Sequence, residues 1–556
     1  MHKPSRRAFL ATAGASAAAA AVAACTGAPP SSAPGEGNSN AANANKSGAM
    51  TNYAVGTQFK ASKPLTFSIA ILSNPNYPFK ANWLFLAHLK QLTNVSFNPN
   101  VVPFADYDTK VGTLIAAGQQ PYIIPKTYPG AEAAFVAGGQ ILPVSDYLQH
   151  MPNFQAKVAA WNLNADLDTL RQSDGKYYLL PGLHQSVPLD YTMGVRTDLL
   201  TKYNIPTPST LAQVEAMLTT FKDKNPGHFP FSDRYNQPTA GGAFLQMIGN
   251  AYGTHAGWNY QSYNQGAYWD FTNKKYVFAA AMPQYQQMVT FLNGWYNKGL
   301  IDPESFTQPD TQAQAKLTSG KSFALMENAQ QIAIDQKAMK PGQTVGKIPV
   351  PLGPTGATVT GSRLDAGLMI SSKAASDPNF IAMLQFIDWL WYSDAGMLYA
   401  RWGIEGTTYT GSVADGTFAL EPNVDWSGLH PNAKIEINVQ YGFYNGVFSV
   451  GGSNQLMDTQ YPSAELAFQK IMDVRTPLPV NPPAPLTTLQ QQTATTSGTS
   501  LMDYVQSQTV GFITGKRPLS QWGAFQNELQ GKGSASFLNI FTTAYNTYNS
   551  AHPSGS

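Results

Sequence analysis

Strand-like and helix-like segments alternate over residues 64–125, and this alternation most restricts the fold of the chain. The stretch PLTFSIAIL (residues 64–72) is apolar and bounded by Pro and by SNPNYP, as is typical of a buried strand followed by a loop. ANWLFLAHLKQLTN then predicts a helix and VSFNPNVVPF a strand, and DYDTKVGTLIAAGQQ predicts a helix before the strand YIIP. Such alternation predicts an α/β fold with a parallel, doubly wound sheet.

Ligands of sheets of this kind bind beyond the carboxyl ends of the strands. Asn76 and Tyr77 follow the first predicted strand, and Tyr128 follows the strand YIIP. We therefore expect these residues in loops that border a binding site.

Apolar residues at helical spacing predict three further helices. PSTLAQVEAMLTTFKDK offers Thr210 as the N-cap, with Gln213 three residues later. The other two stripes run from Tyr285 to Tyr296 and from Phe380 to Trp391. We interpret all three as core packing, because apolar residues that recur on one helix face are usually buried.

The first 25 residues have the layout of a bacterial export signal. A short basic start precedes an uncharged, Ala-rich run that ends at Cys25, and SRRAFL resembles a twin-arginine signal. VAAC resembles the lipobox of lipoproteins, although an ordinary small-residue cleavage site is the alternative. Cys25 is the only cysteine in the chain, so an internal disulfide is excluded, and a lipid anchor on Cys25, with diacylglycerol on the thiol and palmitate as a further acyl group, suits its position. Residues 26–55 are rich in Gly, Pro, Ser, Asn and Ala, which predicts a flexible tether to the outer face of the membrane.

Composition narrows the classes of partner. Charged residues make up 12% of the chain, about half the usual share, and aromatic residues also make up 12%. The formal net charge is +2 and no basic stripe occurs, so we expect no nucleic-acid partner. No segment after the signal has the roughly 18 apolar residues of a membrane span. Low charge combined with many aromatic rings suits a neutral polyhydroxyl ligand.

Motifs for several catalytic chemistries are missing from the sequence. The 8 histidines show no pair at metal-ligand spacing, there is no cysteine cluster, and no G-x-S-x-G elbow occurs, so we expect no metal and no cofactor. SGKS (319–322) ends like a phosphate loop, but Ala315 stands where its first Gly belongs. A glycosidase needs two carboxylates about 5–10 Å apart, a condition that sequence spacing leaves open.

Several segments resemble a known family. LIAAGQQPYII is similar to A-S-G-x-x-P-D-I-I, DGKYYLLPG to D-G-K-x-Y-x-x-P, and VRTDLLTKYNIPTPST to R-x-D-W-L-x-K-L-G-I-x-x-P-x-T. FIDWLWYSDAGMLYARWGIEGTTY contains the family's G-I-E-G segment, and GFITGKRPLSQW follows in the expected order. In this order behind a lipobox, these segments resemble the extracellular oligosaccharide-binding lipoproteins of bacterial ABC importers, in the branch that includes alginate-binding proteins.

The resemblance implies a periplasmic-binding-protein-like fold, in which two α/β lobes close on a sugar like a Venus flytrap. By analogy, the chain crosses between the lobes near residues 186–196 and 363–371. Lobe one would cover residues 60–188 and 371–432, and lobe two residues 189–370 and 433–550. The partners implied are an oligosaccharide and the membrane permease of an ABC importer, and we expect a monomer.

One segment departs from the family pattern. Many relatives carry an acidic D-x-N-G-N-G-x-x-D calcium loop after the helix that corresponds to residues 210–224. Here the segment reads FKDKNPGHFPFSDR and lacks the alternating oxygen ligands that Ca²⁺ requires. We therefore predict no calcium at this position.

The resemblance and the predicted loops together indicate the residues that contact the ligand. Sugar rings present an apolar face and a hydroxyl edge, so their sites combine flat aromatic rings with planar hydrogen-bonding groups. Trp402 and Glu405 lie in the G-I-E-G segment, and Asp190 lies at the first crossing. The full set of candidates is Trp402, Glu405, Trp258, Trp269, Asp190, Tyr191, Tyr128, Tyr77, Trp83, Tyr409 and Tyr441.

Two alternatives to a sugar-binding protein without catalytic activity stay open. The stretch RWGIEGTTYT (401–410) places Glu405 among glycines and aromatic residues, as in glycoside hydrolases. An anchored polysaccharide hydrolase or lyase that uses Glu405 is therefore the first alternative. A peptide- or lipid-binding lipoprotein, with a deep apolar or charged pocket, is the second.

Overall fold

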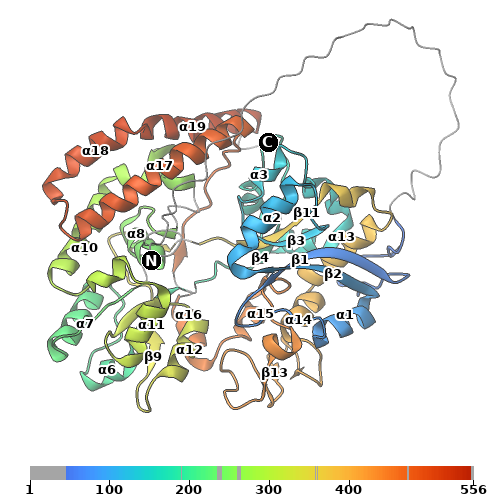
Figure 1. Cartoon of the computed structure of the whole chain (residues 1–556), viewed down its shortest axis with the longest axis horizontal. Helices are drawn as coiled ribbons and strands as arrows, with labels where there is room; N and C mark the ends of the chain where they lie inside the picture. The colour runs from blue at the N-terminus through green and yellow to red at the C-terminus, as the bar shows by residue number, and fades with distance from the viewer. Residues whose placement is uncertain are drawn as a thin grey trace, which may run out of the picture. The chain divides into compact units, whose positions relative to one another are not determined.

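The segment predicted as the first strand forms an interior strand of a six-stranded sheet, next to one of its edges. The computed structural model describes residues 46–189, 191–233, 241–258, 264–356, 358–359, 361–472 and 475–552. In it, β1 (Leu65–Ser73) pairs in parallel with both β2 (Val95–Pro103) and β3 (Ile123–Thr127). Phe67 and Ile69 of β1 are buried, since helices cover the sheet (Figure 1).

This sheet is mixed, not wholly parallel. Its order is β16–β4–β11–β3–β1–β2, and β11 runs antiparallel to β3 and β4. The remaining strands are β4 (Leu180–His184), β11 (Leu364–Ile370) and β16 (Gly451–Gly452). β11 follows a long excursion through the second lobe and enters the sheet from the opposite end. The parallel arrangement predicted from the alternation therefore holds except at β11.

Helices and short strands complete lobe one around this sheet. The helices are α1 (Leu84–Thr93), α2 (Tyr107–Ala116), α3 (Ala133–Val136), α4 (Pro152–Ala160), α5 (Asn164–Asp168), α13 (Phe380–Tyr392), α14 (Asp394–Trp402) and α15 (Asn454–Asp458). The short strands are β12 (Tyr409–Thr410), β13 (Ala419–Leu420), β14 (Val424–Asp425) and β15 (Ile435–Glu436). Every residue of α13 except Ile381 is buried, which confirms that its apolar stripe is core packing.

Lobe two contains a smaller antiparallel sheet of order β8–β5–β9. Its strands are β5 (Thr192–Arg196), β8 (Ala324–Glu327) and β9 (Val345–Lys347), and a hairpin adds β6 (Ala267–Asp270) and β7 (Lys275–Phe278). The proline-rich segment 476–486 begins with β17 (Thr476–Pro477), which pairs with β10 (Thr358–Val359).

The helices of lobe two pack around a second hydrophobic core and two smaller apolar clusters. They are α6 (Thr197–Lys202), α7 (Leu211–Lys224), α8 (Gly242–Tyr252), α10 (Pro283–Asn297), α11 (Asp310–Ser319), α12 (Ala329–Ala338), α16 (Ser463–Met472), α17 (Thr488–Ile513), α18 (Trp522–Gly531) and α19 (Ser534–Ala551). The predicted cap is confirmed, because Thr210 Oγ1 accepts a 3.2 Å hydrogen bond from the Gln213 N–H. The stripe of α10, including Tyr285 and Trp295, is buried as predicted. Figure 1 shows α17, α18 and α19 running along one edge of this lobe.

The chain passes between the two sheets at places that differ in part from the predicted boundaries. The connection from β4 to β5 covers residues 185–191, of which Asp190 lies outside the described residues. Residues 435–456 were expected in lobe two, but Phe443, Phe448 and Leu456 pack in the core of lobe one. β11 likewise belongs to the larger sheet. The passage back to lobe two therefore follows α15 and not residue 432.

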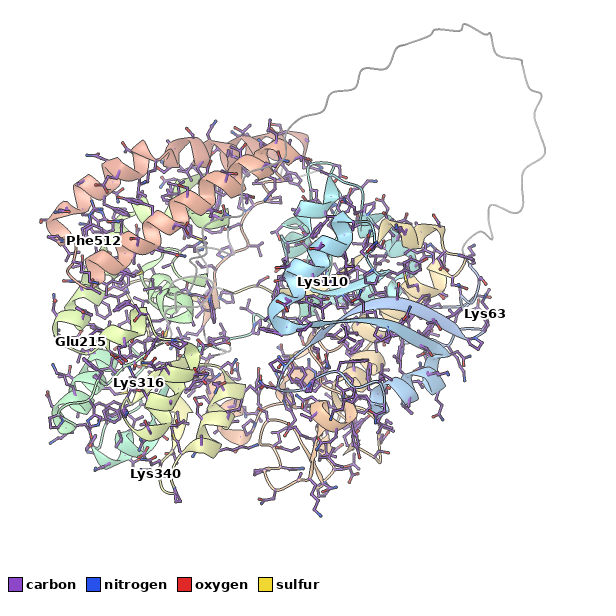
Figure 2. All side chains as sticks on the ribbon, in the orientation of Figure 1. Lys63, Lys110, Glu215, Lys316, Lys340 and Phe512 are labelled. Atoms are coloured by element: carbon purple, nitrogen blue, oxygen red, sulfur yellow. The ribbon has the colours of Figure 1, made fainter. Side chains whose placement is uncertain are left out.

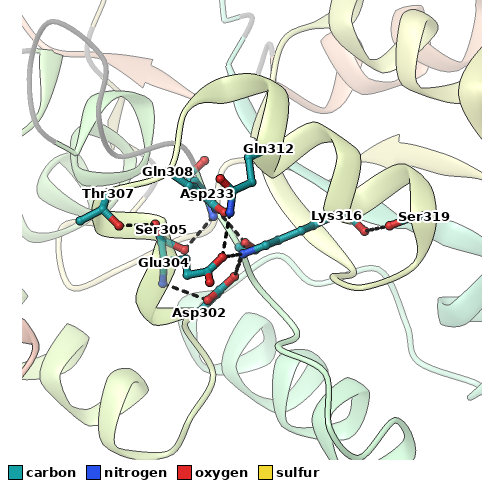
Figure 3. Close-up of polar contacts among 10 residues, drawn as sticks. Asp233, Asp302, Glu304, Ser305, Thr307, Gln308, Gln312, Lys316 and Ser319 are labelled. Atoms are coloured by element: carbon teal, nitrogen blue, oxygen red, sulfur yellow. Dashed lines mark hydrogen bonds and ion pairs between the residues drawn. The ribbon is translucent and has the colours of Figure 1, made fainter. Parts of the chain in front are cut away.

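The segment predicted to lack a calcium loop joins a network around a lysine instead. Its last described residues, Ser232 and Asp233, lie against the loop that carries Asp302. Figure 3 shows Lys316 reaching from α11 to this loop, and its Nζ lies 2.6 Å from Asp302 Oδ2 and 2.5 Å from Glu304 Oε2. Within the described part of the chain, no group of three or more His, Cys, Asp or Glu side chains is arranged to hold a metal.

The first described residues, 46–61, are attached to lobe one. Gln385 of α13 exchanges two hydrogen bonds with the backbone of Met50, at 2.9 and 3.0 Å. One turn further along α13, Asp388 Oδ2 accepts hydrogen bonds from Tyr53 Oη at 2.9 Å and from the N–H of Asn153 at 3.0 Å. Asn153 lies in the first turn of α4, so one carboxylate joins three segments. None of the described helices has the length and apolar character needed to span a bilayer.

Candidate ligand-binding site

A cavity of about 500 Å³ receives side chains from both lobes. This volume lies within the usual range of small-molecule sites, about 300–1,000 Å³. Lobe one contributes the loop after β1, the ends of β4 and β11, and the segments around Trp426 and Tyr444. Lobe two contributes α8, Trp258 and the first turns of α12, while the crossing residues Pro188 and Leu189 line the wall between them.

In lobe two, two aromatic rings form one corner of the cavity. Tyr191 meets Trp258 edge to face, with ring centroids 4.8 Å apart and planes at 86°. Asn328 Nδ2 donates a 2.9 Å hydrogen bond to Tyr191 Oη, which orients the phenol ring. Gly242 makes room for the indole, because a Cβ at this position would lie 3.3 Å from Trp258 Nε1.

In lobe one, Trp426 and Tyr444 form the facing aromatic corner. Their rings stack with centroids 3.6 Å apart and planes at 21°. Next to them, the Trp402 ring lies 5.0 Å from the Tyr444 ring, measured between centroids. The Arg401 guanidinium also lies 5.0 Å from the centroid of the Tyr444 ring. Buried side chains therefore hold Tyr444 in position from the side away from the cavity.

Amide side chains line the cavity between the two corners. Gln246 and Asn250 lie four residues apart on α8 and so point to the same side of the helix. Asn328 and Gln330 lie at the start of α12, where Asn328 Oδ1 caps the helix by accepting the Gln331 N–H at 2.8 Å. These amides offer both donors and acceptors to a ligand.

One acid–base pair lies in the cavity wall. His184 Nε2 is 3.2 Å from Asp365 Oδ2, and the Ala366 N–H donates to Asp365 Oδ1 at 2.6 Å. Burial alone would raise the pKa of Asp365, but the hydrogen bond and charge of His184 together with the Ala366 N–H hold the pKa below its usual value. Asp365 therefore stays ionised as a hydrogen-bond acceptor.

Aromatic faces combined with amides and one paired carboxylate suit the binding of a polyhydroxyl ring. Asp365 is the only acid among the described residues that line the cavity. The chemistry present in these walls is therefore that of holding a ligand through stacking and hydrogen bonds.

Three of the candidates from the sequence line the cavity, namely Tyr77, Tyr191 and Trp258. Tyr77 follows β1 and Tyr191 precedes β5, so both lie in the loops where ligand contacts are expected. Tyr128 follows β3 but does not line the cavity, and 57% of its surface is exposed. Asp190 lies outside the described residues.

The structure places four other candidates inside the hydrophobic cores. Trp402 is fully buried, and its Nε1 donates a 2.7 Å hydrogen bond to Thr459 Oγ1. Trp83 is 1% exposed and donates from Nε1 to the carbonyl of Val439 at 3.2 Å. The other two are Trp269, packed against Tyr276 and Tyr545, and Tyr409, stacked on Phe418. None of the four is among the cavity-lining residues, because each ring already has protein partners on its faces.

Glu405 and Tyr441 also lie apart from the cavity lining. Glu405 is exposed at a turn that Thr408 closes, since Thr408 Oγ1 accepts the Ile404 N–H at 2.8 Å. Tyr441 is half-buried at the edge of the first core. The described cavity wall thus holds a single carboxylate, Asp365, and the hydrolase alternative, in which Glu405 acts on a bound sugar, would need Glu405 at this wall.

Trp426 and Tyr444 were not among the sequence candidates. Trp426 occurs in NVDWSGLHPN and Tyr444 in QYGFYNG, two stretches without helical period. Trp258, a sequence candidate that lines the cavity, lies in a comparable stretch, GTHAGWNYQ, which also places Gly and Asn beside the aromatic residue. The same residue types therefore mark both regions.

The two-lobed fold and the cavity between its lobes define a solute-binding protein. The chain belongs to the family described as bacterial extracellular solute-binding protein, whose model matches residues 76–395, more than half of the chain. This is a family of binding proteins and not of enzymes.

Relatives of known name agree with this assignment. Lipoprotein LipO of Bacillus subtilis is 23% identical over 352 residues, which cover 61% of this chain and 66%, just under two thirds, of that protein. The polygalacturonan/rhamnogalacturonan-binding protein YtcQ of the same organism is 21% identical over 399 residues, covering 66% of this chain and 75% of that protein. Among solved structures, a human-milk-oligosaccharide-binding, ABC-transporter-associated solute-binding protein from Bifidobacterium longum infantis shares the fold. It matches with a TM-score of 0.67 and 18% identity, over 88% of this chain and 99% of that chain.

Proposed function

We propose that this protein captures an oligosaccharide in the cavity between its two lobes. The observation that carries the proposal is the pair of aromatic corners, Tyr191 with Trp258 and Trp426 with Tyr444, which face one cavity lined with amides. Sugar rings stack their apolar faces on such rings and direct their hydroxyls to amides. The relative YtcQ, a polygalacturonan/rhamnogalacturonan-binding protein, supports the same class of ligand.

Capture works through closure of the lobes. A ligand that contacts both aromatic corners binds the closed arrangement more tightly than an open one, so it shifts the population toward closure. The segments that connect β4 with β5 and α15 with α16 act as the hinge. A membrane permease of an ABC importer then receives the sugar from the closed form.

The protein is held at the cell surface by lipid on Cys25, after export directed by the first 25 residues. Cys25 lies outside the described residues, and the proposal rests on the lipobox-like VAAC and on the relative named as a lipoprotein. Replacing Cys25 with Ser should release the protein from the membrane fraction into the medium. Retention of the variant in the membrane would contradict the lipid anchor, and Arg6→Lys combined with Arg7→Lys tests whether export uses the twin-arginine route.

Thermal unfolding in the presence of an oligosaccharide panel tests the binding function. A ligand that binds only the folded protein at about 100 times its Kd stabilises it by about 2.7 kcal/mol and raises the Tm. Trp258→Ala should abolish that rise. Trp269→Phe, a buried tryptophan of the same lobe that does not line the cavity, should retain it.

Two results would overturn the proposal. A rise in Tm with peptides and with no glycan would assign a peptide-binding protein instead. Release of reducing ends from a polysaccharide, abolished by Glu405→Gln, would assign an anchored hydrolase.

A further inference from the structure

Lys126 occupies a strained position at the carboxyl end of β3. Its φ is +60°, a backbone conformation that non-glycine residues rarely adopt. Pro125 and Thr127 pair with Leu368 and Gly367 of β11, and the register shifts between these two, so Lys126 bulges out of the ladder.

Two other non-glycine residues with positive φ line the cavity wall, namely Ser427 and Tyr444, at 51° and 50°. Backbone strain persists where the surrounding structure enforces it, and it is common at ligand sites. Lys126 adjoins the same wall, because its Nζ approaches the lining residue Gly446.

The ammonium of Lys126 lies beside the cavity-lining residues Gly446 and Tyr77. A Cβ built on Gly446 would lie 3.2 Å from Lys126 Nζ and 3.9 Å from Tyr77 Oη, so both polar atoms surround one point. Nζ also lies 5.8 Å from the centroid of the Tyr128 ring. Among the residues that the structure describes, Nζ makes no hydrogen bond and no ion pair.

A desolvated ammonium that lacks a hydrogen-bond acceptor raises the free energy of the folded protein. Burial lowers the pKa of Lys126, and the charge of Asp365 opposes this effect only in part. Asp365 accepts the Ala366 N–H and pairs with His184, and among the described residues it forms no direct ion pair with Lys126. A desolvated cation gains most from an ionised acceptor that a ligand brings.

The side of the cavity that belongs to lobe two adds positive electrostatic potential. Asn328 caps α12, and Ala329 and Gln330 of its first turn line the cavity. The start of a helix carries a partial positive charge, which favours a negative group nearby. Lys126 in lobe one and the start of α12 in lobe two thus both attract a negatively charged group of the ligand.

We propose that Lys126 binds a carboxylate of the ligand, so that the captured oligosaccharide contains a sugar acid. This inference rests on the proposed function and makes it more specific, because composition alone had suggested a neutral ligand. Asp365 then accepts a hydroxyl of the same or the neighbouring sugar.

Isothermal titration of the purified protein with matched probes tests the inference. The probes are oligogalacturonate and oligomannuronate, each paired with its methyl ester, which keeps the size of the sugar and removes the charge. The wild type should bind at least one acid about 10-fold or more tightly than its ester, as expected for a charge-assisted hydrogen bond. Lys126→Met should remove that preference, and Lys126→Arg should restore part of it.

Lys63→Met is the matched control. Lys63, labelled in Figure 2, is exposed and precedes β1. It lies before the amino ends of the parallel strands, whereas Tyr77 and Lys126 lie at their carboxyl ends. This variant should bind the acids as the wild type does, with the Tm of all variants measured alongside.

The outcomes separate the inference from the proposed function. Equal binding of acids and esters, or an unchanged preference in Lys126→Met, would overturn the role of Lys126 and leave sugar capture standing. Absence of binding to these probes and to neutral oligosaccharides would overturn sugar capture, and the inference with it.

Discussion

The Tyr191 ring is fixed against Trp258 by a hydrogen bond that Asn328 donates to its hydroxyl at 2.9 Å. Asn328 also caps α12, so the aromatic corner of lobe two and the first turn of that helix are positioned together. Any ligand that stacks on this corner therefore meets the start of α12 at the same time.

Tyr191→Phe should weaken ligand binding without unfolding the lobe. The variant keeps the edge-to-face contact with Trp258 but removes the acceptor for Asn328, a loss of about 1 kcal/mol or roughly 5-fold in Kd. Titration calorimetry measures the change. Tyr441→Phe, a half-buried tyrosine outside the cavity lining, is the control and should leave Kd unaltered.

Trp402→Phe should affect stability more than binding. The indole is fully buried and donates to Thr459, so its replacement removes a hydrogen bond and leaves a void. The free energy of unfolding should fall by about 1–3 kcal/mol in urea titrations. Kd should change by less than about 3-fold, whereas Trp426→Ala, which removes a cavity-lining ring, should raise it about 10-fold or more. The reverse ranking would show that Trp402 contacts the ligand.

Glu132 should make stability fall as pH rises. Its carboxyl is fully buried, and burial raises the pKa to about 7, although the Gly130 N–H donates to Oε2 at 2.8 Å and opposes the shift. The folded protein therefore retains a proton that the unfolded chain releases above about pH 4.5. The contribution of Glu132 to the free energy of unfolding is therefore fully present below about pH 4.5 and is lost as the pH rises through about 7.

Glu132→Gln checks this sign, since the amide is neutral at every pH. The variant should be more stable than the wild type at pH 8, by on the order of 3 kcal/mol, and the difference should vanish near pH 4. Chemical unfolding at both pH values measures it. A difference that is the same at pH 4 and pH 8 would rule out titration of this carboxyl.

Lys316→Met should destabilise lobe two. The ammonium bridges Asp302 and Glu304, and the Asp302 side chain is only 5% exposed. Removal of the lysine leaves a buried carboxylate without its cation, which costs about 3 kcal/mol. Lys298→Met is the control, because Lys298 pairs with Glu215 while 57% exposed and should cost less than about 1 kcal/mol. Figure 2 labels Glu215 and Lys316 in this lobe.

Local signals in the sequence predicted much of the fold. The Thr210 cap and the buried stripe of α13 follow from residue types at helical spacing, and both appear in the structure. The return of the chain through residues 435–456 into lobe one could not be predicted, because these residues carry no regular period. Where such a segment packs depends on partners that are distant in the sequence.

The candidate site was harder to predict for the same reason. Trp402 and Trp426 both stand near glycines in the sequence, yet Trp402 ends α14 facing the core and Trp426 lines the cavity. Lys126 gives no sequence signal, because its position depends on a bulge opposite Gly367 that only the pairing of β3 with β11 creates.

The attachment of residues 46–61 to α13 and α4 has a mechanical consequence. Tyr53 and Met50 bind side chains of lobe one, so the lipid anchor proposed above would pull on lobe one alone. In the proposed closure, lobe two would then move about the hinge without moving the attachment point. The proposed anchor would therefore constrain the orientation of lobe one and leave lobe two free to close on a ligand.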